Sequence, residues 1–431
     1  MNICVVGTGY VGLVTALGFA KLGNRVICVD KDDDKIGNLN KGIPSIYEEG
    51  IEEILRECLE KKRIAFTNDL SEGINNSEII FIAVGTPEKD DWNIDMTQVH
   101  EVVNQISNII SSYKIIVIKS TVPVGTQRET KKHLREKGVP EENFDIVSNP
   151  EFLSEGRALN DFLNGDRIVI GCDSSKGKII MRKVYEHFNS EIIYTLPETA
   201  EIIKYASNAF LATKISFINE IANLCTKVGA NIETVAYAMG LDKRIAPEFL
   251  RAGIGFGGSC FPKDTKALVK IGENHGIDLK IIRSAIRVNE KQRLIPIKIL
   301  LNKYGKLENK TITILGLAFK PKTDDIRNAP SLTIIEELIK NKARIKCYDP
   351  IATDKVKNMQ WDILCYKNLY DAVDKSDCAI ICTEWDEIYS MDLSIVKERM
   401  NYPMIIDGRN ILDLEKVKES EIEYYSIGRL N

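Results

Sequence analysis

Long apolar segments, paired cysteines and an excess of basic charge are all missing from this sequence of 431 residues. No uninterrupted apolar run approaches the roughly 20 residues that a membrane span requires. The net charge of −4 argues against a large basic surface for nucleic acid or anionic lipid. Ten cysteines are present, but none forms a CxxC pair, which argues against a zinc site. We therefore expect no metal, no nucleic acid partner and no membrane partner.

The first residues, MNICVVGTGYVG, carry a glycine motif where the apolar core of a signal peptide would run. Several cysteines, such as Cys4 and Cys28, lie in strand-like apolar runs where a thiol acts as a small hydrophobic group. We expect reduced cysteines and a cytoplasmic location. The composition, 44% hydrophobic and 28% charged, is that of a globular protein, and the length predicts two or three domains.

Short apolar runs alternate with helical patterns over the first part of the chain, at 3–6, 25–30, 78–85, 114–120 and 166–172. This alternation predicts a mainly parallel sheet with both faces covered by helices. The same pattern returns at Lys310, and one of its later strands ends on an acidic residue, Asp349. The glycine turn of this second region is degenerate, with Gly316-Leu-Ala-Phe in place of a full motif.

Between these regions, residues 198–227 contain neither Pro nor Gly, and apolar residues recur three and four positions apart. The pattern predicts one helix of unusual length. We interpret it as a spine that joins the two halves and packs against a second subunit.

The motif Gly7-x-Gly9-x-x-Gly12 follows the first apolar run and precedes a helical segment. In this context Gly7 makes a turn, Gly9 lets the backbone approach a pyrophosphate, and Gly12 packs helix on strand. The next strand ends on Asp30, whose carboxylate would accept hydrogen bonds from a ribose diol and repel a 2′-phosphate. The motif therefore predicts NAD rather than NADP.

A second glycine-rich stretch, GIGFGGSCFPKD at 253–264, places Cys260 directly after four glycines. A nucleophilic thiol needs access, a nearby cation or base, and stabilisation of the oxyanion that it forms. The glycines suggest access and backbone amides, and Lys263 is a nearby cation. The alternative is a cysteine that merely fills a tight turn.

Seven motifs together resemble the UDP-glucose/GDP-mannose dehydrogenase family: GTGYVG, KSTVPVGT (119–126), SNPEFLSEG (148–156), EIIKYASNAF (201–210), GFGGSCFPKD, LGLAFKPKTDDIR (315–327) and IDGRN (406–410). The resemblance covers essentially the whole chain. It implies two Rossmann-like, doubly wound α/β domains joined by a long central helix in a small helical dimerisation domain. The implied boundaries are 1–197 for the NAD-binding domain, 198–300 for the central domain and 301–431 for the UDP-sugar-binding domain.

The resemblance implies an NAD-dependent four-electron oxidation of UDP-glucose to UDP-glucuronate by a homodimer. Six catalytic residues follow by motif position: Cys260, Lys204, Asp264, Asn208, Thr121 and Glu151. Cys260 would add to the intermediate aldehyde, giving a thiohemiacetal and then a thioester. Lys204 would stabilise the alkoxide and later oxyanions, with Asn208 one helical turn further along the same face.

Asp264 and Thr121 would order the catalytic water, and Glu151 would act as acid or base. Taken alone, Lys204 on a long helix is more often a solvated lysine, and Lys263 with Asp264 could be a solvated surface pair. These alternatives stay open at the level of the sequence.

The implied cofactor set is Gly7, Gly9, Tyr10, Val11, Gly12, Asp30, Lys35, Thr86, Thr121, Glu155 and Arg327. The implied substrate set is Glu151, Phe152, Leu153, Lys204, Asn208, Arg244, Phe249, Arg251, Gly257, Lys320 and Arg409. Within these sets, Arg327 would reach the NAD pyrophosphate from the second α/β domain. Arg244 would be offered to the substrate of the neighbouring subunit.

Alternatives remain for the substrate and for the class of protein. The hexosamine branch of the family usually carries a histidine before the cysteine, where this chain has Ser259, which favours a hexose. Phe261 fits the UDP-glucose pattern better than the GDP-mannose pattern. The other hypotheses are a GDP-mannose or UDP-N-acetylhexosamine dehydrogenase, a two-electron hydroxyacid dehydrogenase that needs no Cys260, and an inactive nucleotide-binding protein.

Overall fold

A computed structural model describes residues 1–429 of the chain. The chain folds into two compact units, Met1–Ser207 and Asn208–Asn431, which are described separately below. The last two residues of the predicted third domain, 430–431, lie outside the described residues. The three predicted domain boundaries stay a prediction. Across residues 1–429, no helix combines the length and the apolar character needed to cross a membrane.

The first unit is built on an eight-stranded sheet in the order β3-β2-β1-β4-β5-β6-β7-β8. Neighbouring strands are parallel, except that β6 and β7 meet antiparallel at Ser148 and Gly171. This confirms the predicted mainly parallel sheet. The strands are β1 (Asn2–Val6), β2 (Arg25–Val29), β3 (Ile64–Thr67), β4 (Ile79–Ile82), β5 (Lys114–Ile118), β6 (Phe144–Ser148), β7 (Arg167–Gly171) and β8 (Glu191–Thr195).

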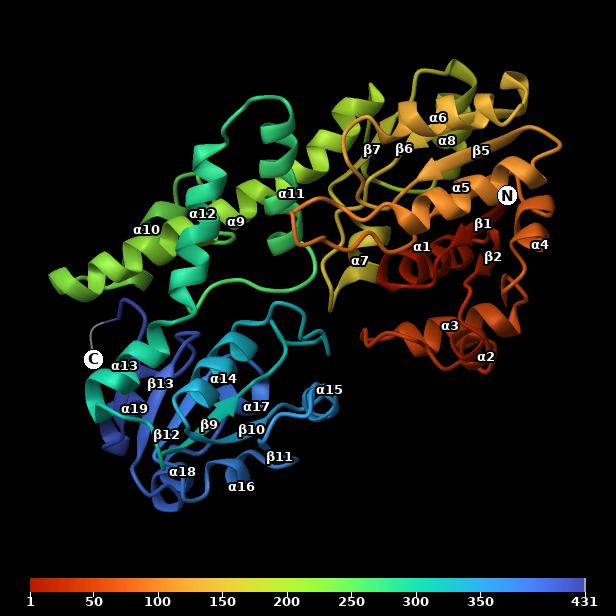
Figure 1. Ribbon diagram of the computed structural model, residues 1–431. Coiled ribbons are helices and arrows are strands. Elements are labelled where there is room, and N and C mark those ends of the chain that lie inside the picture. The colour runs from red at the N-terminus through yellow and green to blue at the C-terminus, as the bar shows by residue number, and fades with distance from the viewer. Residues whose placement is uncertain (430–431) are drawn as a thin grey trace. The chain divides into compact units, whose positions relative to one another are not determined.

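Helices cover both faces of this sheet, because side chains of a strand alternate between its two faces. Ile3 and Val5 of β1 pack under one group of helices, and Cys4 and Val6 pack under the other. The first group is α1 (Tyr10–Lys21), α2 (Asp33–Asn40), α3 (Ile51–Glu60), α7 (Ala158–Leu163) and α8 (Ser175–Val184). The second is α4 (Leu70–Asn75), α5 (Thr97–Ile109) and α6 (Thr126–Glu136) (Figure 1).

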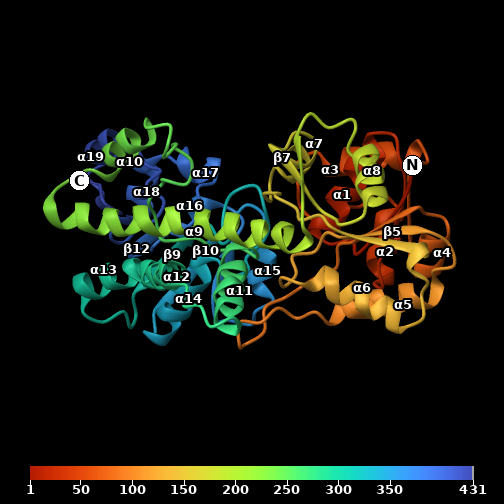
Figure 2. The same cartoon turned by 90° about the horizontal axis from the view of Figure 1, so that it is seen from above.

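The predicted spine is one continuous helix, α9 (Pro197–Val228), of 32 residues (Figure 2). Its first 11 residues, about three turns, belong to the first unit and the rest belongs to the second. Lys204 and Asn208 therefore lie one turn apart in the same helix, on either side of the division between the units.

The second unit contains a fully parallel six-stranded sheet in the order β11-β10-β9-β12-β13-β14. Its strands are β9 (Thr311–Leu315), β10 (Arg344–Tyr348), β11 (Leu364–Tyr366), β12 (Cys378–Ile381), β13 (Met404–Asp407) and β14 (Glu423–Ser426). If β9 is counted as the first strand, the order is 3-2-1-4-5-6, which the first six strands of the other sheet also follow.

Helices complete the second unit, and one hydrophobic core joins the later turns of α9 to the six-stranded sheet. The helices ahead of the sheet are α10 (Ile232–Gly240), α11 (Phe261–Asn274), α12 (Lys280–Gln292) and α13 (Ile295–Tyr304). Those between its strands are α14 (Pro330–Lys340), α15 (Thr353–Lys357), α16 (Leu369–Val373), α17 (Asp386–Tyr389), α18 (Leu393–Arg399) and α19 (Leu414–Ser420).

Candidate active site

The first glycine motif forms a tight turn between β1 and α1. Gly7 adopts φ +97°, and its N–H donates to the Val29 carbonyl at 2.8 Å. A side chain at Gly12 has no room, because a Cβ there would lie 1.8 Å from the carbonyl oxygen of Gly7. Gly9 is different: a Cβ there would meet nothing within 4 Å, so the space above it is open. The turn thus has one exposed backbone surface that a ligand can approach closely.

Asp30 follows β2 and faces this turn. Its Oδ2 accepts hydrogen bonds from the Thr8 N–H at 2.8 Å, the Thr8 hydroxyl at 2.6 Å and Lys35 Nζ at 3.2 Å. Within residues 1–429, its Oδ1 accepts one hydrogen bond, from the Asp32 N–H at 3.2 Å. Burial by itself raises the pKa of Asp30, but the Thr8 hydrogen bonds and the Lys35 charge outweigh it and hold the pKa below its ordinary value. An ionised carboxylate whose Oδ1 accepts one long hydrogen bond can accept further hydrogen bonds from a ribose diol.

These residues fit a dinucleotide. Helix α1 begins at Tyr10 with no side chain capping its first amides, and the dipole of a helix start favours a pyrophosphate. Val11, in the first turn of α1, and Thr86, after β4, are half-buried at the same edge of the sheet. Gly7, Gly9 and Asp30 would hold the cofactor, which accepts a hydride when bound.

Glu48 is a residue of this region that the sequence did not single out. Its buried carboxylate accepts hydrogen bonds from the Tyr10 hydroxyl, the Gly156 N–H at 2.7 Å and the Ala158 N–H at 2.6 Å. It thereby joins the start of α1 to the loop that contains Glu155. Nothing in the stretch SIYEEG distinguishes Glu48 from its neighbour Glu49, so sequence reasoning had no signal for it.

Lys204 and Glu151 form a buried ion pair in the first unit. Lys204 Nζ donates to Glu151 Oε1 at 2.7 Å, and the two side chains are 3% and 6% exposed. The other carboxylate oxygen of Glu151 accepts the Leu153 N–H at 2.5 Å. Burial by itself raises the pKa of Glu151, but the charge and hydrogen bond of Lys204 hold it below its ordinary value. The alternative of a solvated Lys204 is therefore wrong.

Lys119 lies close to this pair and is the first residue of the motif KSTVPVGT, but the sequence predicted no role for it. It follows β5 and is 4% exposed. Burial lowers the pKa of Lys119 to about 8, and the charge of Glu151 offsets only part of this shift. The available signal was the apolar run KIIVIKS around Lys119, because a continuous apolar run is typical of a strand that is buried on both faces.

A cavity of about 280 Å³ lies beside these charges, within the first unit. Lys119, Glu151, Phe152 and Leu153 are among the residues that line it. The guanidinium of Arg167 stacks over the Phe152 ring at 4.1 Å. Thr121 lines a separate gap of about 10 Å³ together with Lys204, which is close to the space that one water needs. The structure thus brings Thr121, Lys204, Glu151 and Phe152 into one region.

In the second unit, Cys260 directly precedes α11 and is half-buried, with its sulfur 3.5 Å from the Ser259 hydroxyl oxygen. The positive end of a helix favours negative charge at this position. Asp264, one turn into the helix, accepts hydrogen bonds from Asn208 Nδ2 and from Lys263 Nζ, both at 2.6 Å. Because Asp264 is 1% exposed, the alternative of a solvated surface pair is wrong for it. Lys263 is engaged by Asp264.

Close packing explains why glycines precede Cys260, and this explanation was not available from the sequence. A Cβ at Gly255 would lie 2.5 Å from Asn289 Oδ1, and one at Gly258 would lie 2.9 Å from the Phe319 ring. Both residues also adopt positive φ, +95° and +86°. A Cβ at Gly253 would lie 2.7 Å from the carbonyl oxygen of Gly408, and one at Gly257 would lie 2.4 Å from that of Asn328. The loop is buried and close-packed, so these positions require glycine because neighbouring protein atoms occupy the space of a side chain.

Arg409 holds this loop in place. Its guanidinium donates to the carbonyl oxygens of Cys382 at 2.7 Å, Gly255 at 2.9 Å and Phe319 at 3.3 Å. Lys320 Nζ lies over the Phe319 ring at 5.4 Å. The structure therefore brings the predicted substrate residues Arg409, Lys320 and Gly257 together around the loop.

Two other predicted arginines pair with an aspartate of their own segment. Arg327 is exposed and pairs with Asp325 at 2.7 Å, and Arg244 is 88% exposed and pairs with Asp242 at 2.6 Å. The backbone carbonyl of Arg327 accepts the Gly258 N–H of the glycine loop at 2.9 Å.

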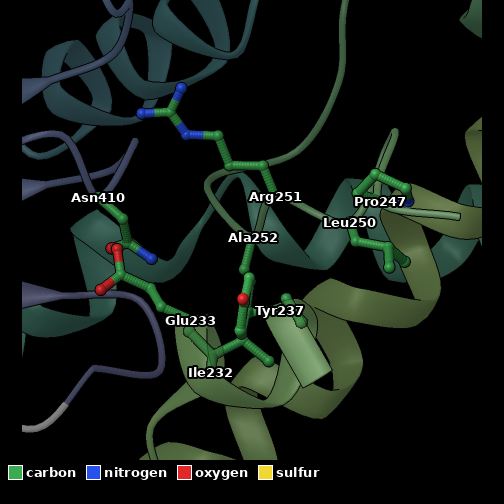
Figure 3. A pocket seen from close by; sticks show the side chains of 9 residues that line it. Ile232, Glu233, Tyr237, Pro247, Leu250, Arg251, Ala252 and Asn410 are labelled. Atoms are coloured by element: carbon green, nitrogen blue, oxygen red, sulfur yellow. The ribbon is translucent and has the colours of Figure 1, made fainter. Parts of the chain in front are cut away.

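Arg251 and Phe249 lie at the other end of the same segment. Arg251 borders a cavity of about 220 Å³ whose wall includes Tyr237 and Leu250, and its guanidinium points away from Tyr237 (Figure 3). No other predicted substrate residue lines this cavity. Phe249 adopts φ +64°, and its ring packs at 6.1 Å from the Phe261 ring. Within residues 1–429, no cluster of three or more potential metal ligands occurs.

Comparison with protein families assigns all three parts of the chain to one family. Residues 1–189 match the NAD binding domain of the UDP-glucose/GDP-mannose dehydrogenase family. Residues 198–291 match its central domain, and residues 313–414 match its UDP binding domain.

Two relatives are similar over their full length. UDP-glucose 6-dehydrogenase TuaD of Bacillus subtilis is 46% identical over 99% of this chain and 93% of its own. UDP-glucose 6-dehydrogenase of Rhizobium meliloti is 41% identical over 100% of both chains.

Two solved structures of nucleotide-sugar dehydrogenases also resemble this chain over its whole length. A UDP-glucose dehydrogenase from Pyrobaculum islandicum superposes with a TM-score of 0.93 at 36% identity, covering 99% of this chain and 98% of the other. A UDP-D-ManNAc dehydrogenase from Pyrococcus horikoshii superposes with a TM-score of 0.89 at 29% identity, covering 100% and 99%.

Proposed function

The chain belongs to the UDP-glucose/GDP-mannose dehydrogenase family, and we propose that it oxidises UDP-glucose to UDP-glucuronate with two NAD+ per turnover. The overall reaction consumes one water and releases two NADH and three protons. Relatives that are 41% and 46% identical over nearly the whole chain carry the name UDP-glucose 6-dehydrogenase, which supports this substrate.

One observation carries the proposal. Lys204 and Asn208 lie one turn apart on α9, and each is buried with a carboxylate that hydrogen-bonds to it, Glu151 for Lys204 and Asp264 for Asn208. Burial of charged groups is costly, and perturbed charged groups cluster at functional sites. A cation, an amide and two carboxylates are the groups that alcohol oxidation followed by hydrolysis requires.

The first oxidation removes a proton and a hydride from the C6 alcohol of the sugar. Glu151 is kept ionised by Lys204 and can accept the proton, directly or through water. The ammonium of Lys204 and the amide of Asn208 then stabilise the negative charge that develops on the C6 oxygen. The bound NAD+ supplies the hydride acceptor.

The second oxidation needs a covalent bond, because an aldehyde has no second hydride to give until a nucleophile adds to it. The Cys260 thiolate adds to the aldehyde carbon and forms a thiohemiacetal, from which the second hydride leaves to give a thioester. Water then attacks the thioester, the C–S bond breaks, and the thiol is restored. Asp264 and Thr121 would orient this water.

The stoichiometry of the reaction tests the proposal directly. With UDP-glucose limiting and NAD+ in excess, we expect two NADH per UDP-glucose consumed, measured by absorbance. One NADH per sugar would instead indicate a two-electron dehydrogenase. Turnover of GDP-mannose or UDP-N-acetylmannosamine in preference to UDP-glucose would overturn the substrate and leave the chemistry standing.

A matched pair of cysteine variants separates the thiol chemistry from folding. Cys260→Ser should lose net turnover while still binding NAD+, as measured by calorimetry. Cys365→Ser is the control, because Cys365 is also half-buried and lies in the same unit. It should keep the activity of the unaltered protein. Equal activity of the two variants would exclude the covalent route.

We also propose that the protein is a homodimer formed through α9. Phe210, Phe217 and Leu224 recur at intervals of seven and are 66%, 46% and 56% exposed. An exposed apolar stripe with this spacing is suited to pairing with another helix. Sedimentation should give a dimer for the unaltered protein and a monomer for Phe217→Asp, and a monomer in both would reject the interface. The exposed Arg244 is proposed to reach the partner's substrate.

The cytoplasm is the proposed location, because eight of the ten cysteines are buried thiols rather than disulfides. Cell fractionation with an antibody against the chain tests this, and recovery in a secreted fraction would reject it.

A further inference from the structure

Two cysteines lie side by side on the last two strands at one end of the six-stranded sheet. Cys347 on β10 and Cys365 on β11 are direct register partners, and β11 is the outermost strand. Their sulfur atoms lie 3.1 Å apart. Neither residue belongs to the site described above.

The backbone positions suit a covalent bridge. Neighbouring strands lie about 4.8 Å apart, which is within the range of about 4.4–6.8 Å between the Cα atoms of disulfide-bonded cysteines. Side chains of register partners point to the same face of the sheet. A disulfide bond is about 2.05 Å long, so the sulfur atoms need to approach by only about 1 Å.

The two thiols differ in exposure and in pKa, the properties that decide which thiol acts as the nucleophile. Cys347 is buried, whereas Cys365 is half-buried on a strand of only three residues. The hydrogen bond with the Cys347 thiol and the charge of Lys357 lower the pKa of Cys365. The same hydrogen bond, together with burial, raises the pKa of Cys347. Reactive thiols are accessible and readily ionised, which describes Cys365.

We propose that Cys347 and Cys365 form an oxidisable dithiol, which closes to an intramolecular disulfide in the presence of a low-molecular-weight disulfide such as oxidised glutathione. In the first step the Cys365 thiolate attacks the small disulfide, breaks its S–S bond and releases one small thiolate. In the second step Cys347 loses its proton to solvent and attacks Cys365 Sγ, which releases the second small thiolate. The dithiol is oxidised by two electrons, and the small disulfide is reduced to two thiols.

Peptide mapping tests this without any activity measurement. Trypsin cuts after Lys346, Lys355, Lys357 and Lys367, which places the two cysteines in separate peptides, 347–355 and 358–367. Each peptide contains one cysteine. After incubation of the full chain with oxidised glutathione and alkylation of remaining thiols, we expect these two peptides joined, with the loss of two hydrogens. Dithiothreitol should separate them again.

Three variants make the test specific. Cys347→Ala should accumulate the glutathionyl adduct on Cys365, because no second thiol can displace it. Cys365→Ser should give neither the bridge nor an adduct on Cys347, and its unchanged thermal unfolding in the reduced state would show that it folds. Cys260→Ser, the other half-buried cysteine, should form the bridge at the same rate as the unaltered protein.

Several outcomes would overturn the proposal. These are a glutathionyl adduct on Cys365 of the unaltered chain that never resolves, a crosslink between chains on a non-reducing gel, and a linked peptide that forms only in denaturant. A supporting readout is the midpoint of thermal unfolding, which should rise by a few degrees on oxidation in the unaltered protein and stay constant in Cys365→Ser.

Discussion

Each of the two sheets has an aspartate just after its second strand, Asp30 in the first unit and Asp349 in the second. The surroundings begin alike. The first strand of each sheet is followed directly by a glycine with positive φ, Gly7 at +97° and Gly316 at +92°. The N–H of each glycine donates at 2.8 Å to the last residue of the second strand. The same strand order therefore produces the same turn twice.

The two carboxylates are nevertheless used in opposite ways. Asp349 is 3% exposed, and its two oxygens accept five hydrogen bonds, from the N–H groups of Leu317, Ala318, Ile351 and Ala352 and from Trp385 Nε1. Asp30 keeps one oxygen with a single long hydrogen bond. A shared topology does not give a shared role, because the role depends on how many protein donors already occupy the carboxylate.

The fifth strands differ in the same manner. β5 is followed by Lys119, which is buried with only the charge of Glu151 to offset the loss of water. β13 ends at Asp407, which is buried but accepts hydrogen bonds from three backbone N–H groups and the Tyr424 hydroxyl. In the second unit both oxygens of Asp349 accept hydrogen bonds from protein donors, whereas in the first unit one oxygen of Asp30 accepts a single long hydrogen bond within residues 1–429.

The largest effect should come from Asp349→Asn. The amide nitrogen of asparagine would face N–H donors and leave at least two of them without an acceptor, which costs about 2–4 kcal/mol of unfolding free energy. Urea unfolding measures it. Asp30→Asn is the control and should cost less than about 1 kcal/mol, because its carboxylate is more exposed. Equal losses in the two variants would contradict the contrast between the sheets.

Lys119→Met should stabilise the protein in a pH-dependent way. The folded pKa of about 8 lies below the ordinary value near 10.4, so the buried charge destabilises the folded state below pH 8. This cost is relieved as pH rises from 8 to about 10. The variant should be more stable by roughly 3 kcal/mol at pH 7, with the difference gone above pH 10. Lys137→Met, an exposed site, should show no such trend. A constant difference across this range would mean that Lys119 is not the group responsible.

Gly9→Ala should weaken NAD+ binding and leave folding intact. A Cβ there meets no protein atom within 4 Å but would occupy the space proposed for the pyrophosphate. We expect a Kd for NAD+ about tenfold higher, or about 1.4 kcal/mol, by calorimetry. Gly37→Ala, which also meets no atom within 4 Å, should leave the Kd unchanged. An unaltered Kd for Gly9→Ala would place the pyrophosphate elsewhere.

The smallest effect concerns the choice between NAD+ and NADP+. Asp30→Asn removes the charge that repels a 2′-phosphate. The dissociation constant for NADP+ divided by that for NAD+ should therefore fall about fivefold, which corresponds to about 1 kcal/mol. Lys35→Met should act in the opposite direction, because Lys35 partly neutralises Asp30 at 3.2 Å. A ratio that neither variant changes would show that another residue sets the preference.

The sequence predicted those parts of the fold whose signal is local. Strands with continuous apolar runs, such as β1, β4 and β12, were expected where they occur, because strands buried on both faces leave this pattern. The length of α9 followed from the absence of Pro and Gly. The outer strands β8 and β11 gave no such signal, since β8 is only partly buried and β11 has three residues.

The sequence by itself determined the two Rossmann-like sheets, the long helix and the position of the NAD turn, because apolar periodicity and glycine turns depend on residues close together in the chain. Only the tertiary structure decided that Lys204, Lys119 and Asp264 are buried, and that the glycines before Cys260 are packed against protein atoms. The physical reason is that desolvation and close packing depend on neighbours far apart in the sequence. The helical pattern around Lys204 does not indicate that its buried ammonium pairs with a carboxylate 53 residues earlier in the sequence.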